Sequence, residues 1–401
     1  MTIRTTHVGS LPRTERLIEA NRERRAGSLD EQEFTAVLQE EVNGVVARQA
    51  GLGLTILNDG EYGHAMIDNV DYGAWWTYSF SRFSGLSLED TARFDVKPPA
   101  GREGRLSYSS FAERRDWNLF ADAYSDPESG IHIANKNPVA FPTITSAIAY
   151  IGEEAVDRDI AGTKAALEAA GRPVSDGFVA ALSPGSAARI ANAHYEDDEA
   201  VVWAFAEGLH EEYKRITDAG LTVQIDAPDL AEGWDQFAVE PALEDYRAFQ
   251  RVRIEALNHA LEGIDPALVR YHVCWGSWHG PHTTDIPFKD IVDLALEVKA
   301  NGLTFEAANA RHAHEWTIWK DIDLAEGKYL IPGVVSHSTN VVEHPELVAQ
   351  RIRQFADIVG DERVVAAPPP GGGGGPSPPP ATAPRPPPTP PPPPLPPPPP
   401  P

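Results

Sequence analysis

The chain has 401 residues, 42% of them hydrophobic and 23% charged, which is typical of a globular protein with a large buried core. Its formal net charge of −25 argues against nucleic acid or an anionic membrane surface as the main partner. The opening residues MTIRTTHVGSLPR lack the apolar segment of a signal peptide, and no run of about 18 uncharged apolar residues occurs, so we expect a cytoplasmic protein that does not enter a membrane.

Seven β-type runs, each ending in polar or turn-forming residues, follow one another along the chain. They are GLTILNDGE (53–61), VAFPTITSA (139–147), GFVAALSPG (177–185), LTVQIDAPD (221–229), LVRYHVCWGS (268–277), GLTFEAANAR (302–311) and YLIPGVVSHS (329–338). Helical patterns lie between them, most clearly at 197–219 and 287–301, which end near Gly220 and Gly302. With an eighth run at 363–367, this alternation predicts an α/β fold, a (β/α)8 TIM barrel, and a doubly wound open sheet is the alternative.

The composition changes abruptly after residue 367, where a Pro/Gly-rich segment begins that holds most of the 37 prolines. We therefore predict a catalytic barrel in residues 1–367 and a disordered or polyproline tail in residues 368–401. Because the eighth run leads directly into this tail, we expect the barrel to be incomplete at its eighth strand. Two hypotheses explain the tail: it recruits SH3-, WW- or profilin-like partners, or it reflects a frame or sequence error in a GC-rich gene.

Polar side chains stand at or near the ends of these apolar runs. In chain order they are Asp59, Glu61, Ser183, Asp226, His272, Cys274, Glu306 and His337. In barrel enzymes the catalytic groups lie at the C-terminal ends of the strands, where neighbouring loops meet. We therefore expect these side chains to converge at one end of the barrel.

Cys274 is the only cysteine in the chain, and a lone cysteine in an apolar run is usually a small core residue. Its neighbours indicate a different role. His272 lies two residues earlier, so both side chains face the same side of one strand, and Glu306 ends the next strand. Nitrogen, sulfur and oxygen donors of this kind predict a zinc site, at which a thiol substrate would lose its proton.

Taken together, the motifs resemble the catalytic barrel of cobalamin-independent methionine synthases. The resemblance rests on H-x-C in one strand, a glutamate ending the next, and the segments THVGSLPR, NDGE, IDAPDL and GVVSHS, and it extends from about residue 5 to about residue 367. The same superfamily includes epoxyalkane:coenzyme M transferases, which also alkylate a zinc-bound thiol.

The resemblance implies a role for each matching position. The zinc ligands fall on His272, Cys274 and Glu306, the residues that bind the thiol substrate fall on Ser10, Glu61 and Asp226, and the proton donor to the leaving group falls on His337. It implies methyl transfer to homocysteine from 5-methyltetrahydrofolate or a related donor, with alkyl transfer to coenzyme M as the alternative. The partners would be a small-molecule thiol and a methyl or alkyl donor, and the oligomeric state is left open.

Three features depart from the family pattern. The family has a second zinc cysteine after the eighth strand, and this chain has no other cysteine. Ala227 follows Asp226, where methionine synthases typically have glutamate, and the length allows only one barrel. The chain therefore resembles the short, single-barrel branch, and an impaired homologue whose tail recruits partners is a further alternative.

A second histidine pair has a spacing that could supply metal ligands. His312 and His314 follow a predicted strand and open a helix, in which residues two apart do not share a face. We predict surface or capping roles for both.

Overall fold

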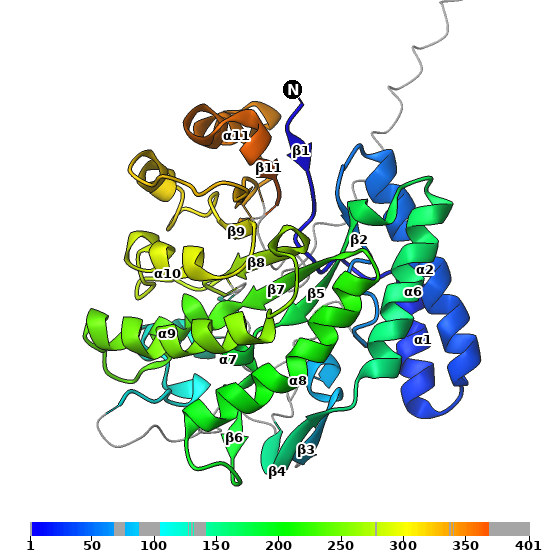
Figure 1. Cartoon of the computed structure of the whole chain (residues 1–401), viewed down its shortest axis with the longest axis horizontal. Coiled ribbons are helices and arrows are strands. Elements are labelled where there is room, and N and C mark those ends of the chain that lie inside the picture. The colour runs from blue at the N-terminus through cyan, green and yellow to red at the C-terminus, as the bar shows by residue number, and fades with distance from the viewer. Residues whose placement is uncertain are drawn as a thin grey trace, which may run out of the picture.

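The computed structural model describes residues 2–67, 77–87, 105–126, 128–129, 131, 142–276, 279–336, 338–339 and 341–368. Within these residues, eight short parallel strands follow one another around a common core (Figure 1). They are β1 (Arg4–Thr5), β2 (Leu57–Asn58), β5 (Gly177–Leu182), β7 (Thr222–Ala227), β8 (Val269–Val273), β9 (Gly302–Glu306), β10 (Tyr329–Gly333) and β11 (Val365–Ala366). The predicted α/β barrel is thereby confirmed.

The barrel is incomplete at its eighth strand, as the sequence predicts. Strands β2, β5, β7, β8, β9 and β10 form one six-stranded sheet, whereas the two-residue strand β11 pairs with β1 in a separate ladder. Single bridges connect β11 to β10, at Leu330↔Val364 and Gly333↔Ala367, and another connects Thr6 to Ile56 of the sheet. These bridges join the ladder of β1 and β11 to the six-stranded sheet on both sides. The predicted tail from residue 369 onward lies outside the described residues.

Helices cover the outside of the sheet (Figure 1). The α-helices are α1 (Glu15–Ala26), α2 (Glu31–Gly51), α4 (Arg115–Leu119), α5 (Ala121–Ser125), α6 (Glu153–Ala169), α7 (Pro184–Ala187), α8 (Asp198–Asp218), α9 (Leu243–Ala260), α10 (Val292–Glu297) and α11 (Pro345–Val359). Short 3-10 helices are η1 (Phe111–Glu113), η2 (Val174–Asp176), η3 (Pro228–Leu230), η4 (Glu232–Gln236), η5 (Pro266–Leu268), η6 (Phe288–Asp290), η7 (Glu315–Lys320) and η8 (Asp361–Arg363).

Side-chain caps explain where the main helices begin. The Asp30 carboxylate accepts from the Glu33 backbone N–H and the Glu33 side chain accepts in return, a capping box that starts α2. The helix predicted at 197–219 is confirmed as α8, which begins at the Asp197 cap and is followed by Gly220 with φ of 83°. Acidic residues in its first turn interact favourably with the helix dipole.

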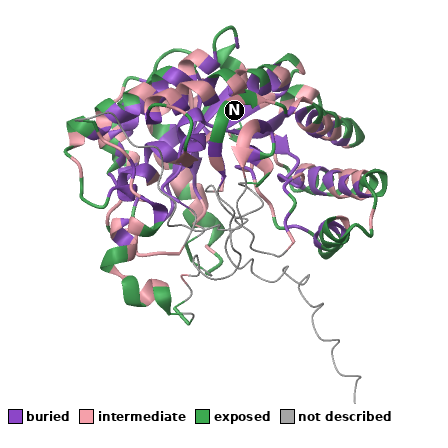
Figure 2. Cartoon of the chain, turned by 90° about the horizontal axis from the view of Figure 1, so that it is seen from below, coloured by how far each residue is buried: buried purple, intermediate pink, exposed green. Residues whose placement is uncertain are grey.

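The core lies inside the strands and between the strands and the helices (Figure 2). Strands β5, β8 and β9 are buried along their whole length. Parallel strands that have a barrel interior on one side and helices on the other must be apolar on both faces, which explains their continuous Val, Ala, Leu and Phe content. Polar residues within these strands are therefore exceptions that call for a partner or a function.

Two sequence predictions were wrong in detail. The run at 139–147 is not a barrel strand: β4 (Thr143–Tyr150) pairs with β3 (Phe83–Ser87) and β6 (Ala191–Asn192) in a separate three-stranded sheet, and β1 is the first barrel strand instead. The predicted helix at 287–301 is only η6 and α10. Gly302 is not its cap but the first residue of β9.

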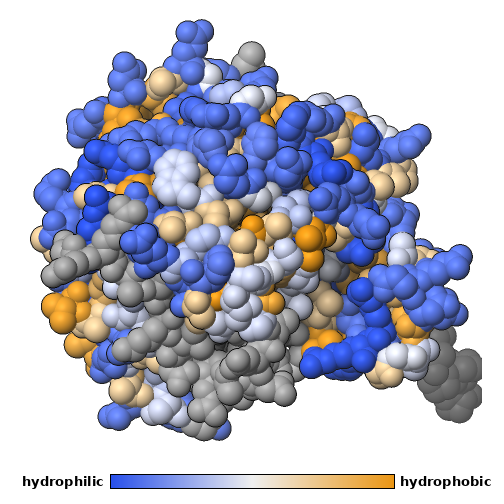
Figure 3. All heavy atoms as spheres, turned by 60° about the horizontal axis from the view of Figure 1, so that its bottom comes forward, coloured by the Kyte–Doolittle hydropathy of each residue, from blue (hydrophilic) through white to orange (hydrophobic). Residues whose placement is uncertain are grey.

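The surface in Figure 3 is mostly hydrophilic, with hydrophobic side chains scattered among the polar ones. Scattered exposed apolar residues are ordinary for a protein surface in water. In the part of the chain that the structure describes, no helix has the length and apolar character needed to span a membrane.

Candidate active site

Strands β7, β8 and β9 bring four of the predicted site residues to one end of the barrel. Asp226 is paired in register with His272, and His272 with Thr304. Cys274 lies two residues beyond His272 and Glu306 two residues beyond Thr304, so the thiol and the carboxylate come from equivalent positions on adjacent strands. The parallel register thus brings these four side chains to the same end of three adjacent strands.

His272 is oriented by its neighbour on β7. The two form a hydrogen bond of 2.6 Å between His272 Nδ1 and Asp226 Oδ1, while Nε2 is buried and has no hydrogen-bond partner among the described residues. Asp226 Oδ1 also accepts from Gln224 Nε2, at 3.0 Å, and the same Gln224 nitrogen donates to the Val8 carbonyl. Because Asp226 can only accept when ionised, this bond places the proton on Nδ1 and leaves the Nε2 lone pair available.

The Cys274 thiol is buried at 8% exposure. Burial and the negative charge of Glu306 raise the pKa of Cys274 well above its usual value, although a hydrogen bond from the Gly276 N–H, at 3.1 Å, acts in the opposite direction. Glu306 is itself buried: its Oε2 accepts from Asn309, and its Oε1 has no hydrogen-bond partner among the described residues. Among the described residues, neither this thiol nor this carboxylate is paired with a cation.

These three residues have the donor atoms of a zinc site. Unpaired buried atoms such as His272 Nε2 and Glu306 Oε1 are costly unless something binds to them, and the nitrogen, sulfur and oxygen donors suit zinc. The side chains do not, however, form a closed shell as they stand. Within the described residues, no group of three or more His, Cys, Asp or Glu side chains is close enough to hold a metal ion.

Ser10 and Glu61 lie beside this group, at the end of the first two strands. Arg13 joins them: its Nη1 donates to Ser10 Oγ at 2.7 Å, and its Nη2 donates to the Glu61 carbonyl. Glu61 has φ of 57°, a left-handed conformation unusual for glutamate, and its N–H donates to Asp59 Oδ1 at 2.9 Å. A side chain at Gly9 would overlap the Glu61 carboxylate, so glycine is required in the segment VGSLPR.

Burial and nearby carboxylates change the protonation of this region. Burial first, and then the charge of Asp226, raise the pKa of Glu61 to about 8, and burial and Asp159 raise the pKa of Asp59 to about 6. His64 Nδ1 lies 3.4 Å from Glu61 Oε2, and burial holds the pKa of His64 well below its usual range. At neutral pH the Glu61 carboxyl is therefore mainly protonated and His64 neutral in the ligand-free protein.

Because the pKa of Glu61 is raised in the folded protein, we expect the free energy of unfolding to depend on pH. Between pH 4.5 and 8 the folded protein holds a proton at Glu61 that the unfolded chain releases, so this contribution to stability is complete below pH 4.5 and is lost as pH rises through 8. Glu61→Gln should flatten the fall in the free energy of unfolding between pH 6 and 8.5, by on the order of 2 kcal/mol. Urea unfolding at a series of pH values measures this effect. Glu40→Gln, at an exposed ion pair, is the control, and equal pH slopes for Glu61→Gln and the unmodified protein would refute the prediction.

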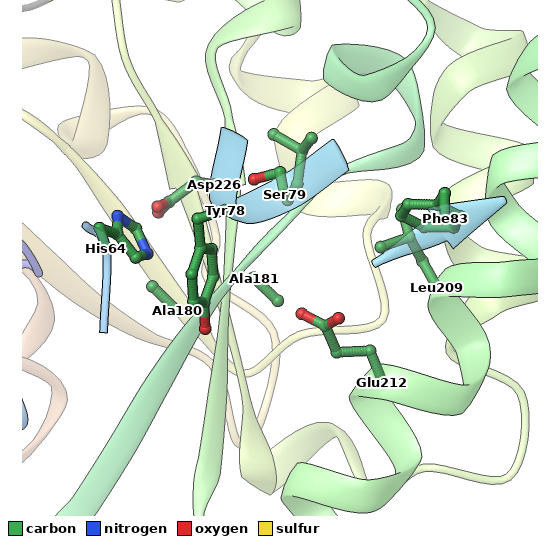
Figure 4. A pocket seen from close by; sticks show the side chains of 10 residues that line it. His64, Tyr78, Ser79, Phe83, Ala180, Ala181, Leu209, Glu212 and Asp226 are labelled. Carbon is green, nitrogen blue, oxygen red and sulfur yellow. The ribbon is translucent and has the colours of Figure 1, made fainter. Parts of the chain in front are cut away.

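A small cavity of about 10 Å³, room for about one water molecule, adjoins the site (Figure 4). Asp226 and His64 lie at one end and Phe83 and Leu209 at the other, with Tyr78 between them. The ring centroids of Tyr78 and His64 lie 3.8 Å apart, and the Tyr78 hydroxyl donates a hydrogen bond to Asp159. The cavity therefore joins Asp226 to a partly apolar wall, and its volume accommodates about one water molecule.

The other predicted residues have different outcomes. His337 lies outside the described residues. Ser183 does not face the metal-ligand candidates: its hydroxyl caps α7 and donates to Asp229 at 2.7 Å. The surface role predicted for His312 was wrong, because His312 is buried between Asp285 and Glu315, whose carboxylates raise its pKa to about 9. His314 is exposed, as predicted.

Three residues of the site were missed by the sequence reasoning. Arg13 and His64 lie within or next to the motifs VGSLPR and NDGE, so their proximity to Ser10 and Glu61 was a usable signal. Asn309 follows Glu306 by three residues, but no spacing rule for strand ends identifies an amide as its partner.

The chain is similar to several known proteins. Residues 3–74 match the family described as the catalytic domain of cobalamin-independent synthases. The 2-hydroxypropyl-CoM lyase of Xanthobacter autotrophicus is 23% identical over 351 residues, which cover 75% of this chain and 86% of that protein. The 5-methyltetrahydropteroyltriglutamate–homocysteine methyltransferase of Nitratidesulfovibrio vulgaris is 24% identical over 315 residues, which cover 77% of this chain and 31% of that protein.

The fold is similar to two solved structures. A B12-independent methionine synthase from Shewanella sp. W3-18-1 superposes with a TM-score of 0.59 at 17% identity, covering 92% of this chain and 90% of that chain. A putative vitamin-B12 independent methionine synthase from Listeria monocytogenes gives 0.57 at 15% identity, with 92% of each chain covered. The protein is thus an α/β barrel with polar side chains gathered at its strand ends. The resemblance to the cobalamin-independent methionine synthase family is confirmed.

Proposed function

We propose that this protein is a zinc-dependent enzyme that transfers a methyl group to a small-molecule thiol, with homocysteine as the acceptor and 5-methyltetrahydrofolate or a related compound as the donor. The observation that carries the proposal is the set of possible metal donors at adjacent strand ends, next to Asp226. His272 Nε2 and Glu306 Oε1 are buried without a hydrogen-bond partner among the described residues, and the Cys274 thiol is buried beside them in the strand register. The names of the relatives give the reaction class.

His272, Cys274 and Glu306 would hold the zinc ion, which when bound supplies positive charge that lowers the pKa of the acceptor thiol. Three protein ligands leave one position for that thiol, so the missing second cysteine of the family does not by itself prevent binding. The Asp226 carboxylate orients His272 through Nδ1, as carboxylates commonly do for metal-binding histidines.

Ser10, Glu61 and Asp226 would hold the acceptor next to the metal ligands. Asp226 Oδ1 is engaged by His272 and Gln224, which leaves Oδ2 for the ammonium group of an amino-acid thiol. Glu61 is uncharged when the site is empty, and an arriving ammonium group favours its ionised form. The sulfur then forms the new bond to the methyl carbon as the bond from that carbon to the donor nitrogen breaks, and His337 gives the nitrogen a proton.

The test is an assay of the full chain loaded with zinc. With homocysteine and 5-methyltetrahydrofolate, as monoglutamate and triglutamate, mass spectrometry should detect methionine, and a chelator should stop its formation. Asp226→Asn should lower kcat/KM by about 100-fold, because it weakens both the ammonium contact and the orientation of His272. Asp218→Asn, at an exposed ion pair, is the matched control. Full activity in the presence of chelator would exclude the proposal.

An alkyl transfer to coenzyme M is the second candidate, and it is favoured by two observations. One relative is named 2-hydroxypropyl-CoM lyase, and Ala227 stands where methionine synthases typically have glutamate. In this reaction the sulfur attacks an epoxide carbon and the ring oxygen takes up a proton. Coenzyme M with epoxypropane, assayed beside homocysteine with the folate donors, separates the two reactions by their products.

A non-catalytic protein with a partner-binding tail is the remaining alternative. It predicts no product from either pair of substrates, and tail-dependent capture of a profilin, SH3 or WW domain that Cys274→Ser leaves unchanged.

A further inference from the structure

The two carboxylate oxygens of Glu306 are in different environments. Oε2 accepts a hydrogen bond from Asn309 Nδ2, whereas Oε1 is buried without a hydrogen-bond partner among the described residues. We propose that Asn309 is the positioning residue for the metal ligand Glu306, which it holds by Oε2 so that Oε1 remains available to the ion. This inference rests on the proposed zinc-dependent function.

The orientation of the Asn309 amide is fixed by its own contacts. Its Oδ1 accepts from the backbone N–H groups of Arg311, at 2.8 Å, and His312, at 3.0 Å. The oxygen therefore faces these two donors, and the Nδ2 group must be the one that faces Glu306. The side chain is 6% exposed, so it has little room to change rotamer.

The loop that carries Asn309 is itself anchored to the strand that carries Cys274. The His312 ring contacts Asp285 through Nε2, at 2.9 Å, and Glu315 through Nδ1, at 2.8 Å. Its ring centroid also lies 4.1 Å from that of Trp275, the residue after Cys274. Asn309 is thus tied both to Glu306 and to the neighbouring strand end.

A neutral amide is chemically suited to this role. An arginine or lysine in the same place would orient Glu306 but would also cancel its charge, and the carboxylate would then attract a cation less strongly. The amide donates a hydrogen bond and leaves the negative charge in place. Outer partners of metal ligands affect metal affinity by about 10–100-fold, through the geometry of the ligands that they hold.

Asn309→Asp is the main test, because a carboxylate retains oxygen acceptors for the two backbone N–H groups but cannot donate to Glu306. Zinc affinity, measured by competition with a chromophoric chelator, should fall about 10–100-fold. The matched control is Asn258→Asp, at a half-buried asparagine whose Nδ2 donates to a backbone carbonyl and whose Oδ1 accepts from a backbone N–H. It should leave zinc affinity unchanged.

Two further variants make the result specific. Asn309→Ser, which keeps a hydroxyl acceptor in a smaller side chain, replaces Asn309→Asp if that variant does not fold by circular dichroism. In a Glu306→Gln background, Asn309→Asp should cause no additional loss of zinc affinity, because Asn309 acts through Glu306.

The outcomes separate this inference from the function on which it rests. Zinc binding that is lost in Cys274→Ser but fully kept in Asn309→Asp overturns the role of Asn309 and leaves the proposed function in place. The role of Asn309 is also overturned if Asn309→Asp lowers zinc affinity by the same factor in the unmodified protein and in the Glu306→Gln variant. If the unmodified protein binds no zinc, both the function and the inference fail.

Discussion

Cys274→Ser should lower zinc affinity by more than about 100-fold and abolish thiol alkylation. Replacing a residue that only orients a metal ligand lowers metal affinity by about 10–100-fold. Cys274 would bind the metal directly, in a chain that has no second cysteine, so its loss should have a larger effect. A serine hydroxyl is a much poorer zinc ligand than a thiolate. The metal content of the purified protein and titration with a chelator measure the loss.

Proton release gives a second measure of the same effect. Burial and Glu306 raise the pKa of Cys274, so the thiol is protonated in the metal-free protein. Zinc binding must then release that proton to a weakly buffered solution, and Cys274→Ser should release about one proton fewer per zinc. Zinc binding by Cys274→Ser with unchanged affinity and proton release would contradict the ligand role.

Val273→Thr is the matched control for this variant. It introduces a hydroxyl on the same strand, next to Cys274 but on the other side of the pleat, where Val273 is fully buried. A buried unpaired hydroxyl should lower the free energy of unfolding by about 1–3 kcal/mol and leave zinc affinity unchanged. Loss of zinc in both variants would point to a damaged strand and not to a lost ligand.

The barrel could be predicted from the sequence because most of its strands are continuous apolar runs. Runs such as GFVAAL are buried on both faces, and this local pattern is enough to identify them. Strand β1 has only two residues and is held by a partner some 360 positions away, at β11, so no local pattern reveals it. The run at 139–147 contains a strand, as predicted, because residues 143–147 lie in β4, but its pairing with β3 places that strand outside the barrel.

Some features of the candidate site could likewise be predicted from the sequence, and others could not. The positions of His272, Cys274 and Glu306 follow from strand periodicity and register, which the sequence contains. The contact between Asp226 and His272, and the burial of His312 against Asp285, depend on how loops and neighbouring strands pack. Such contacts join residues 46 and 27 positions apart, and residue type alone does not single them out.

A buried ion cluster behind the cavity should have the largest effect on stability. The Arg82 guanidinium, 2% exposed, lies 2.6 Å from Asp159 Oδ2 of α6 and 2.9 Å from Glu212 Oε1 of α8. The Tyr78 and Tyr150 hydroxyls donate to these two carboxylates at 2.7 and 2.8 Å. Arg82 precedes β3, so this cluster ties the small sheet to two barrel helices.

Arg82→Met should lower the free energy of unfolding by about 3–5 kcal/mol, because it removes the cation from a buried ion cluster. Among the described residues, Asp159 then keeps only Arg158 as a cationic partner, at 3.5 Å, and Glu212 loses its cation. In the part of the chain that the structure describes, Glu212 then retains the Tyr150 hydroxyl and no cation. Urea unfolding followed by circular dichroism measures the change.

Arg215→Met is the control. Arg215 lies on α8, as Glu212 does, and forms an exposed ion pair with Asp157 of α6, so its replacement should cost no more than about 1 kcal/mol.

A second substitution tests whether the uncompensated charge is the cause. In the Arg82→Met background, Glu212→Gln removes the unpaired negative charge of Glu212, while the amide oxygen can still accept a hydrogen bond from Tyr150. The double variant should therefore be more stable than Arg82→Met alone, although Glu212→Gln by itself should be destabilising. If the double variant is less stable than Arg82→Met by the full cost of Glu212→Gln, the loss comes from packing of the long Arg82 side chain and the electrostatic account of this cluster is wrong.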